Sequence, residues 1–199
     1  MTDLVEPEEI LAFWLGVPGS PPLAMTPQWF KKDEALDATI RTKFGPTLEA
    51  AARGELESWL TTARGRLAQI ILFDQFSRNM FRNTPRAFAQ DALALTFALE
   101  ALHNGHYEML SAVERAFVLM PLMHSENLEH QKRCCAEFHK LAAECSADLV
   151  AYFKNSADYA ERHAVIIERF GRFPHRNAQL GRESTPHEIE FLKQPGSSF

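Results

Sequence analysis

Apolar residues recur along the chain at the three- and four-residue spacing of amphipathic helices. The stripe of Leu36, Ile40 and Phe44 is one example, and Gly45-Pro46 is expected to end it. No stretch of alternating polar and apolar residues, bounded by hairpin turns, competes as a strand. The pattern predicts an all-α fold, and the length fits one domain spanning residues 1–199.

The same spacing sets the expected bounds of three further helices. Leu67 and Ile70 lie on a helix expected to end near Ser77. A long helix is expected from Pro85 to His103, and the last long one from Ala147 to Phe170.

Residues typical of helix ends punctuate these segments. Three Thr-Pro pairs place a hydroxyl N-cap before a proline at the first helical position: Thr26-Pro27, Thr84-Pro85 and Thr185-Pro186. The third pair continues to Glu188 and completes a capping box. Left-handed helix ends are expected at four glycines: Gly16, Gly54, Gly105 and Gly171.

Composition and charge narrow the class of protein. A net charge of −5 gives no general attraction to nucleic acid or to an anionic membrane, so any basic site must be local. Cys134, Cys135 and Cys145 form neither a disulfide framework nor a zinc motif, which indicates free thiols in a reducing compartment. The acidic start, Met1 to Ile10, lacks the features of a signal peptide. We therefore expect a cytoplasmic protein, with its oligomeric state left open.

The densest polar segment runs from Arg169 to Arg182. It holds four arginines, His175 and Asn177, and no acid. Guanidinium forks suit carboxylate and phosphate groups, so the run indicates an anion site. The alternative is that these arginines cap helix ends and tie a loop to buried acids.

A second basic segment lies between Asp74 and Arg86. It includes Arg78, Asn79 and Arg82, and no acid occurs from Gln75 through Gln90. Asp74 and Arg78 are four residues apart and are expected to pair on one helical face. The two segments either converge on one pocket or each serve a separate helix end.

A third segment surrounds Glu126. Ser125 is the expected N-cap, which would place Glu126 in the first turn of a helix. Glu126 and His130 are four apart, but the spacings of a di-iron bundle or a zincin are missing, so no metal is predicted. Glu126 is instead expected to be the counter-ion of one of the arginines.

These observations leave three functional hypotheses. The first is a binding module whose pocket takes a small anion or an acidic, carboxylate-bearing peptide, with no cofactor. The second is an enzyme that uses His175 or His124 as acid or base, because cations around a histidine lower its pKa and keep it neutral. The third is a structural protein whose polar motifs only fasten the fold. The expected ligand-binding residues are Arg78, Asn79, Arg82, Glu126, Arg172, His175, Arg176, Asn177 and Arg182.

Five sequence segments together resemble one bacterial family, the domain-of-unknown-function family nine-two-four. They are Phe13-Trp14-Leu15-Gly16, Trp29-Phe30, Ile71 to Asn79, Pro121 to Glu126, and Phe170 to Asn177 with Leu180-Gly181-Arg182. Ser77 stands where the family pattern has proline, and Phe73 where leucine is usual. The resemblance covers about Ile10 to Leu192 and implies a tetratricopeptide-like superhelix of antiparallel helix pairs. It implies no activity, cofactor or catalytic residue.

Overall fold

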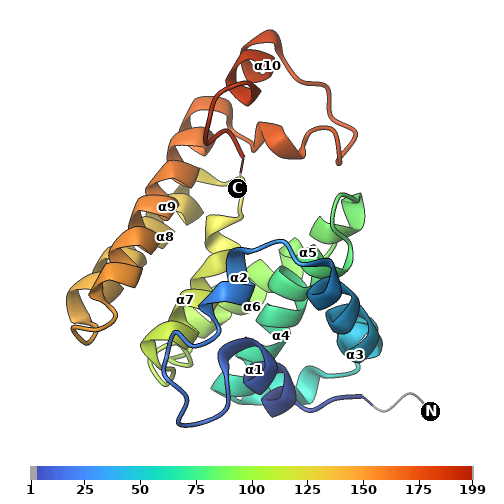
Figure 1. The fold of residues 1–199 in the computed structure, drawn as a ribbon, viewed down its shortest axis with the longest axis vertical. Helices are drawn as coiled ribbons and strands as arrows, with labels where there is room; N and C mark the ends of the chain where they lie inside the picture. The colour runs from blue at the N-terminus through green and yellow to red at the C-terminus, as the bar shows by residue number, and fades with distance from the viewer. Residues whose placement is uncertain (1–3, 199) are drawn as a thin grey trace. The chain divides into compact units, whose positions relative to one another are not determined.

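The structure is a computed structural model that describes residues 4–198. Every regular element of this part is helical, which confirms the all-α prediction (Figure 1). In chain order the elements are α1 (Pro7–Leu15), α2 (Thr26–Phe30), α3 (Glu34–Ala52), η1 (Glu57–Thr61), α4 (Ala63–Ile70), η2 (Ile71–Phe76), α5 (Ser77–Met80), η3 (Pro85–Phe88), α6 (Asp91–His103), α7 (Ala112–Met123), α8 (Leu128–Glu144), α9 (Val150–Phe170), η4 (Pro174–Arg176) and α10 (Pro186–Leu192).

The chain forms two compact units. The first comprises Met1–Arg82 with Arg86–Pro121, and the second comprises Asn83–Pro85 with Leu122–Phe199. The hydrophobic pattern did not indicate this division. The superhelical arrangement of helix pairs remains a prediction.

The core of the first unit surrounds α4, which packs against α1 and α6. Trp14 of α1 is fully buried and meets Phe76 edge-on, with 5.3 Å between ring centroids. Trp29 donates its indole N–H to the Trp14 carbonyl at 2.7 Å. The hydrogen bond between Trp29 and Trp14 holds α2 against α1.

A π-helical turn, η2, lies inside what is otherwise one helix from Ala63 to Met80. The backbone N–H of Ser77 bonds the carbonyl of Leu72, five residues back, and all six residues of η2 are buried. The helix therefore does not end near Ser77. Burial on every side of η2 keeps the chain helical where the sequence pattern indicated a stop.

The expected break at Gly45-Pro46 is also wrong, because α3 continues through Pro46 to Ala52. Phe44 and Leu48 are buried on either side of the proline. A proline inside a helix removes one backbone hydrogen bond. The burial of this apolar face outweighs that loss.

Two of the expected Thr-Pro helix starts differ from the prediction. The N-cap of α2 is Met25, and the Thr26 hydroxyl donates to the Leu23 carbonyl instead of capping. The long helix expected from Pro85 is divided into η3 and α6. The chain turns at residues 89–90, so that Asp91 begins α6.

The second unit is built on the hairpin of α8 and α9, which lie side by side over their length (Figure 1). Helix α9 ends at Gly171, whose φ of 68° is left-handed, as the sequence predicted. Ile166 and Ile167 pack with Phe173 to form the core beyond this end. The Thr185–Glu188 capping box begins α10, also as predicted.

Gly65 and Gly45 provide a matched test of the packing in the first unit. An added Cβ at Gly65 would collide with the Trp59 carbonyl oxygen and lie 2.8 Å from Thr62 Oγ1, whereas nothing lies within 4 Å at Gly45. We expect Gly65→Ala to lower the free energy of unfolding by about 1–3 kcal/mol through overpacking. Gly45→Ala should raise it by up to about 1 kcal/mol through helix propensity. Urea denaturation of the two variants measures both effects, and equal shifts would contradict this account.

Candidate functional site

The first arginine run lies in the first unit, and its cations face internal acids. Arg78 forms a two-pronged bond with Asp91, at 2.9 and 3.0 Å, and its Nη1 is 3.1 Å from Asp74. The predicted Asp74–Arg78 pair is thus confirmed. Arg82 donates hydrogen bonds to both carboxylate oxygens of Asp37, at 2.8 and 2.9 Å.

Asp37 was not predicted as the partner of Arg82 and Asn79. It lies on α3 and also accepts a bond from Asn79 Nδ2 at 2.8 Å. Burial alone would raise the pKa of this carboxyl, but the bonds from Arg82 and Asn79 outweigh burial and lower it. Asp37 therefore stays ionised and ties α3 to the end of α5.

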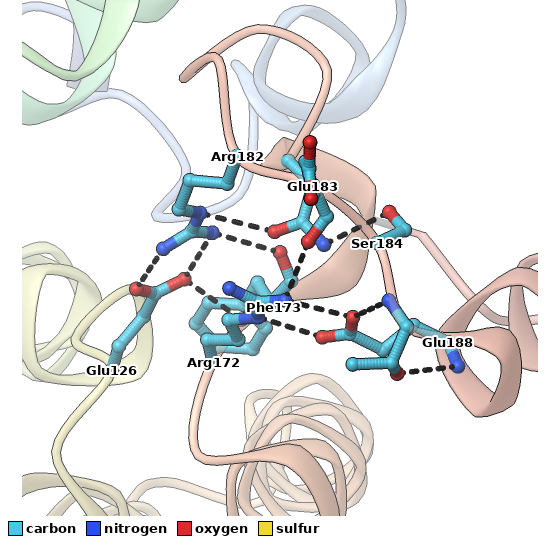
Figure 2. Close-up of polar contacts among 9 residues, drawn as sticks. Glu126, Arg172, Phe173, Arg182, Glu183, Ser184 and Glu188 are labelled. Carbon is cyan, nitrogen blue, oxygen red and sulfur yellow. Dashed lines mark hydrogen bonds and ion pairs between the residues drawn. The ribbon is translucent and has the colours of Figure 1, made fainter.

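In the second unit, Arg172 fastens α10 to the end of α9. Its Nε and Nη2 donate to the two oxygens of Glu188 at 2.7 and 2.8 Å, and Nη2 also donates to the Glu183 carbonyl (Figure 2). Glu188 is 2% exposed and accepts the Thr185 N–H as well. The bond from Arg172 is the main reason that the pKa of Glu188 falls to about 2.

Glu126 is the counter-ion of Arg182, which confirms the expectation for this carboxylate. Arg182 donates to both carboxylate oxygens, at 2.6 and 2.9 Å, and the Phe173 N–H reaches Oε1 at 2.7 Å (Figure 2). Burial would raise the pKa of Glu126, but the bonds from Arg182 and Phe173 lower it. The carboxylate thus holds the loop after α9 in place.

The start of α8 differs from the prediction. Asn127 is the N-cap and accepts the N–H groups of Glu129 and His130. The Ser125 hydroxyl instead lies 2.9 Å from His130 Nδ1. Glu126 therefore precedes the helix, where its carboxylate reaches Arg182 instead of serving the first turn.

The remaining polar residues of the loop also have internal partners. Asn177 accepts from Arg182 Nε at 3.0 Å and donates to the Ser184 hydroxyl at 3.0 Å. Arg176 donates to the His124 carbonyl at 3.0 Å and lies over the Phe173 ring, 4.5 Å from its centroid. Asn177 and Arg176 are both buried, so they organise the loop from inside.

Three imidazoles, of His124, His163 and His175, gather near Phe173. The His163 ring lies 6.4 Å from that of His124, and the Phe173 ring is 5.6 Å from both His163 and His175. Burial is the largest cause that lowers the pKa of His163 to about 3 and of His175 to about 4. The neutral His175 matches the expectation, although burial contributes more than the neighbouring Arg176. A catalytic role for His124 or His175 remains a prediction.

A hollow of about 680 Å³ opens beside this loop, between the end of α9 and the start of α10. We call it the α9–α10 hollow, and its lining consists of Arg169, Phe170, Arg172, Thr185, His187 and Glu188. Arg169 is exposed and lies over the rings of Phe170 and Phe191, at 4.7 and 5.5 Å from their centroids. Within residues 4–198, no carboxylate pairs with Arg169.

Of the sequence-predicted ligand-binding residues, only Arg172 lines this hollow. Arg78, Asn79 and Arg82 belong to the first unit, and the others to the second. Convergence of the two runs on one pocket remains a prediction. Arg169 and His187 were not among the expected site residues, although the basic run that begins at Arg169 was the available signal.

The described part of the chain holds no group of three or more His, Cys, Asp or Glu side chains placed to bind a metal ion. None of its helices combines the length and the apolar character needed to cross a membrane.

The Glu126–Arg182 pair can be tested by removing one charge. Glu126→Gln would set an amide N–H₂ against the Arg182 donors, and we expect the free energy of unfolding to fall by about 1–3 kcal/mol. Glu129→Gln is the matched control, because the Glu129–Lys132 pair is exposed and its loss should change stability by less than about 0.5 kcal/mol. Chemical denaturation at pH 7.5 compares the two. Similar losses would show that the Glu126 pair does not hold the loop.

The buried imidazoles predict a fall in stability on mild acidification. The unfolded chain binds protons at these rings near pH 6.5, whereas in the folded chain His163 and His175 do so only near pH 3 and pH 4. The unfolded state therefore binds more protons below pH 6.5, so the free energy of unfolding decreases as the pH falls. Glu188 adds to the loss only below about pH 4.5, which leaves pH 6.5 to 5 for the histidines.

His163→Asn tests this origin, because asparagine Nδ2 can replace the imidazole Nδ1 that lies 2.7 Å from the Tyr159 carbonyl. Between pH 7 and pH 5, we expect the melting temperature of the variant to fall by less than that of the wild type. His103→Asn removes an exposed imidazole and serves as the control. An unchanged pH dependence in His163→Asn would refute the assignment.

Comparison with known proteins places the chain in a family. Residues 10–196 match the family described as bacterial protein of unknown function (DUF924). The solved structure of a protein of unknown function from Agrobacterium tumefaciens is similar, with 38% sequence identity and a TM-score of 0.78, over 94% of this chain and 96% of that one. No curated protein matches the sequence. The chain therefore belongs to the DUF924 family of bacterial proteins of unknown function.

Proposed function

We propose that the protein binds a small anionic molecule in the α9–α10 hollow. The observation that carries this proposal is the state of Arg169, an exposed guanidinium with no carboxylate partner among residues 4–198. Arg78, Arg82, Arg172 and Arg182 each face an internal acid. Arg169 is thus available to an external anion.

Arg172 supplies further donors to the same space. Its Nε and Nη2 are used by Glu188 and Glu183, but no described group accepts a bond from its Nη1. Arg172 therefore serves both to fasten α10 and to face the ligand. The volume of about 680 Å³ lies within the range of small-molecule sites.

The other arginines are assigned a fastening role in this proposal. Their guanidinium groups are held by Asp37, Asp91 and Glu126, and an anion would have to displace these carboxylates. A purely structural protein is the second candidate, favoured by this internal pairing. The two candidates differ in what they require of Arg169.

Replacement of Arg169 by glutamine tests the proposal. Thermal shift and calorimetry with inorganic phosphate, acetate, citrate and 3-phenylpropionate should reveal at least one anion that stabilises the wild type saturably. We expect Arg169→Gln to bind that anion about tenfold or more weakly, because the substitution removes a charge-assisted hydrogen bond.

Arg162→Gln is the matched control for this experiment. Arg162 is exposed on the same helix, two turns earlier, and lies 4.9 Å from the Tyr159 ring centroid, outside the hollow. It should bind the anion as the wild type does. If no anion stabilises the protein, or if Arg169→Gln binds normally, the structural role stands instead.

A further inference from the structure

We infer that the ligand of the α9–α10 hollow is a monocarboxylate carried by an aromatic or other flat apolar group. This inference rests on the proposed function and specifies its ligand class. Three features of the hollow support it: the charges of its lining, the pairing of Glu188 with Arg172, and the aromatic rings beneath Arg169.

The charge of the lining favours an anion with one negative charge. Among the arginines and acids of the lining, Arg169 and Arg172 carry two positive charges, and Glu188 offsets one of them. A phosphate monoester carries close to two negative charges at neutral pH, so one of them would lack a counter-ion and would also face Glu188. A carboxylate carries one charge and matches the planar guanidinium fork.

The state of Glu188 argues against a free amino acid. Its oxygens accept bonds from Arg172 and from the Thr185 N–H, and the residue is 2% exposed. The acid is therefore not accessible to an ammonium group on the ligand. Glu188 is the only acid among the described residues of the lining, so these residues offer a zwitterion no counter-ion for its positive charge.

Phe170 of the lining and the neighbouring Phe191 supply apolar surface beside Arg169. Phe170 and Phe191 lie 5.0 Å apart between centroids, at 47° to each other, and both are half-buried. They pack on the core of Ile166, Ile167 and Phe173, which keeps them in place. An aromatic body next to a carboxylate held by Arg169 would cover the part of these rings that solvent now reaches.

Four small probes that vary the ring, the acid group and the ammonium group test this class by calorimetry at pH 7.5. We expect 3-phenylpropionate to bind most tightly. Propionate, which lacks the ring, should bind at least about tenfold more weakly. Phenyl phosphate, with its second charge, and phenylalanine, with its ammonium group, should also bind more weakly than 3-phenylpropionate.

A second set of probes distinguishes a peptide end from a small metabolite as the source of the carboxylate. A tetrapeptide that ends in phenylalanine with a free carboxyl group presents the same chemistry as 3-phenylpropionate, and its carboxamide does not. Tighter binding of the free-acid peptide than of 3-phenylpropionate assigns the site to a peptide end. Tighter binding of the small acid assigns it to a metabolite, and equal binding of the carboxamide would overturn the inference.

Variants separate this inference from the proposed function. Arg169→Lys keeps the charge without the fork and should bind 3-phenylpropionate more weakly than the wild type but more tightly than Arg169→Gln. Phe170→Leu should reduce the preference for 3-phenylpropionate over propionate, with circular dichroism as the check of folding. Tighter binding of phenyl phosphate than of 3-phenylpropionate, lost in Arg169→Gln, would overturn the monocarboxylate class alone. No binding by any of these probes would overturn the monocarboxylate inference, and the further failure of inorganic phosphate, acetate and citrate would overturn the proposed function as well.

Discussion

A fixed positive charge that leaves water needs a carboxylate beside it, and this requirement organises the polar residues of both units. In the first unit, Asp91 pairs with Arg78 of α5, and Asp37 pairs with Arg82, which follows α5. In the second it joins Glu126 and Glu188 to the loop that follows α9. Each carboxylate lies on a different segment from its arginine, so each pair also connects two parts of its unit.

Arg169 differs from these arginines, because it is exposed and pairs with no carboxylate within residues 4–198. Its charge lies over aromatic rings instead of against an acid, an arrangement that a cation tolerates at an exposed position. The neighbouring Arg172 keeps Glu188 satisfied, so the acid of the hollow does not neutralise Arg169. The same salt bridge that builds the wall of the hollow therefore leaves its second cation unmatched. Family membership adds no activity to this argument, because the matched family is itself one of unknown function.

Apart from the pairing of Glu126 with an arginine of the later run, the local features predicted correctly from sequence were those set by residues close together in the chain. The Thr185–Glu188 capping box, the left-handed Gly171 and the Asp74–Arg78 pair each depend on neighbours within four positions. Ser125 was expected as the N-cap of α8, but Asn127 caps it, and the arginine that pairs with Glu126 lies 56 residues later.

Long-range contacts account for the features that the sequence did not reveal. Asp37 and Arg82 are 45 positions apart, and nothing in the spacing of either segment links them. The helix through Pro46 persists because of burial on α3, which is decided by neighbours elsewhere in the unit. The hollow is likewise a product of folding, since α10 reaches the end of α9 through the Arg172–Glu188 bond. In the sequence, only the excess of arginine over acid between Arg169 and Arg182 indicated a site in this region.

The π-helical turn η2 determines how this chain tolerates changes of length. An α-helix rotates by about 100° per residue, and the wide turn takes up one residue more than a regular turn does. If the residues between Ile71 and Phe76 formed a regular α-helix instead, everything after them would be turned by about 100°. Asn79 would then point away from Asp37, whereas the contacts of α4 would be kept. The wide turn thus acts as a one-residue spacer, which sets the orientation of the polar residues on α5 independently of the apolar face on α4.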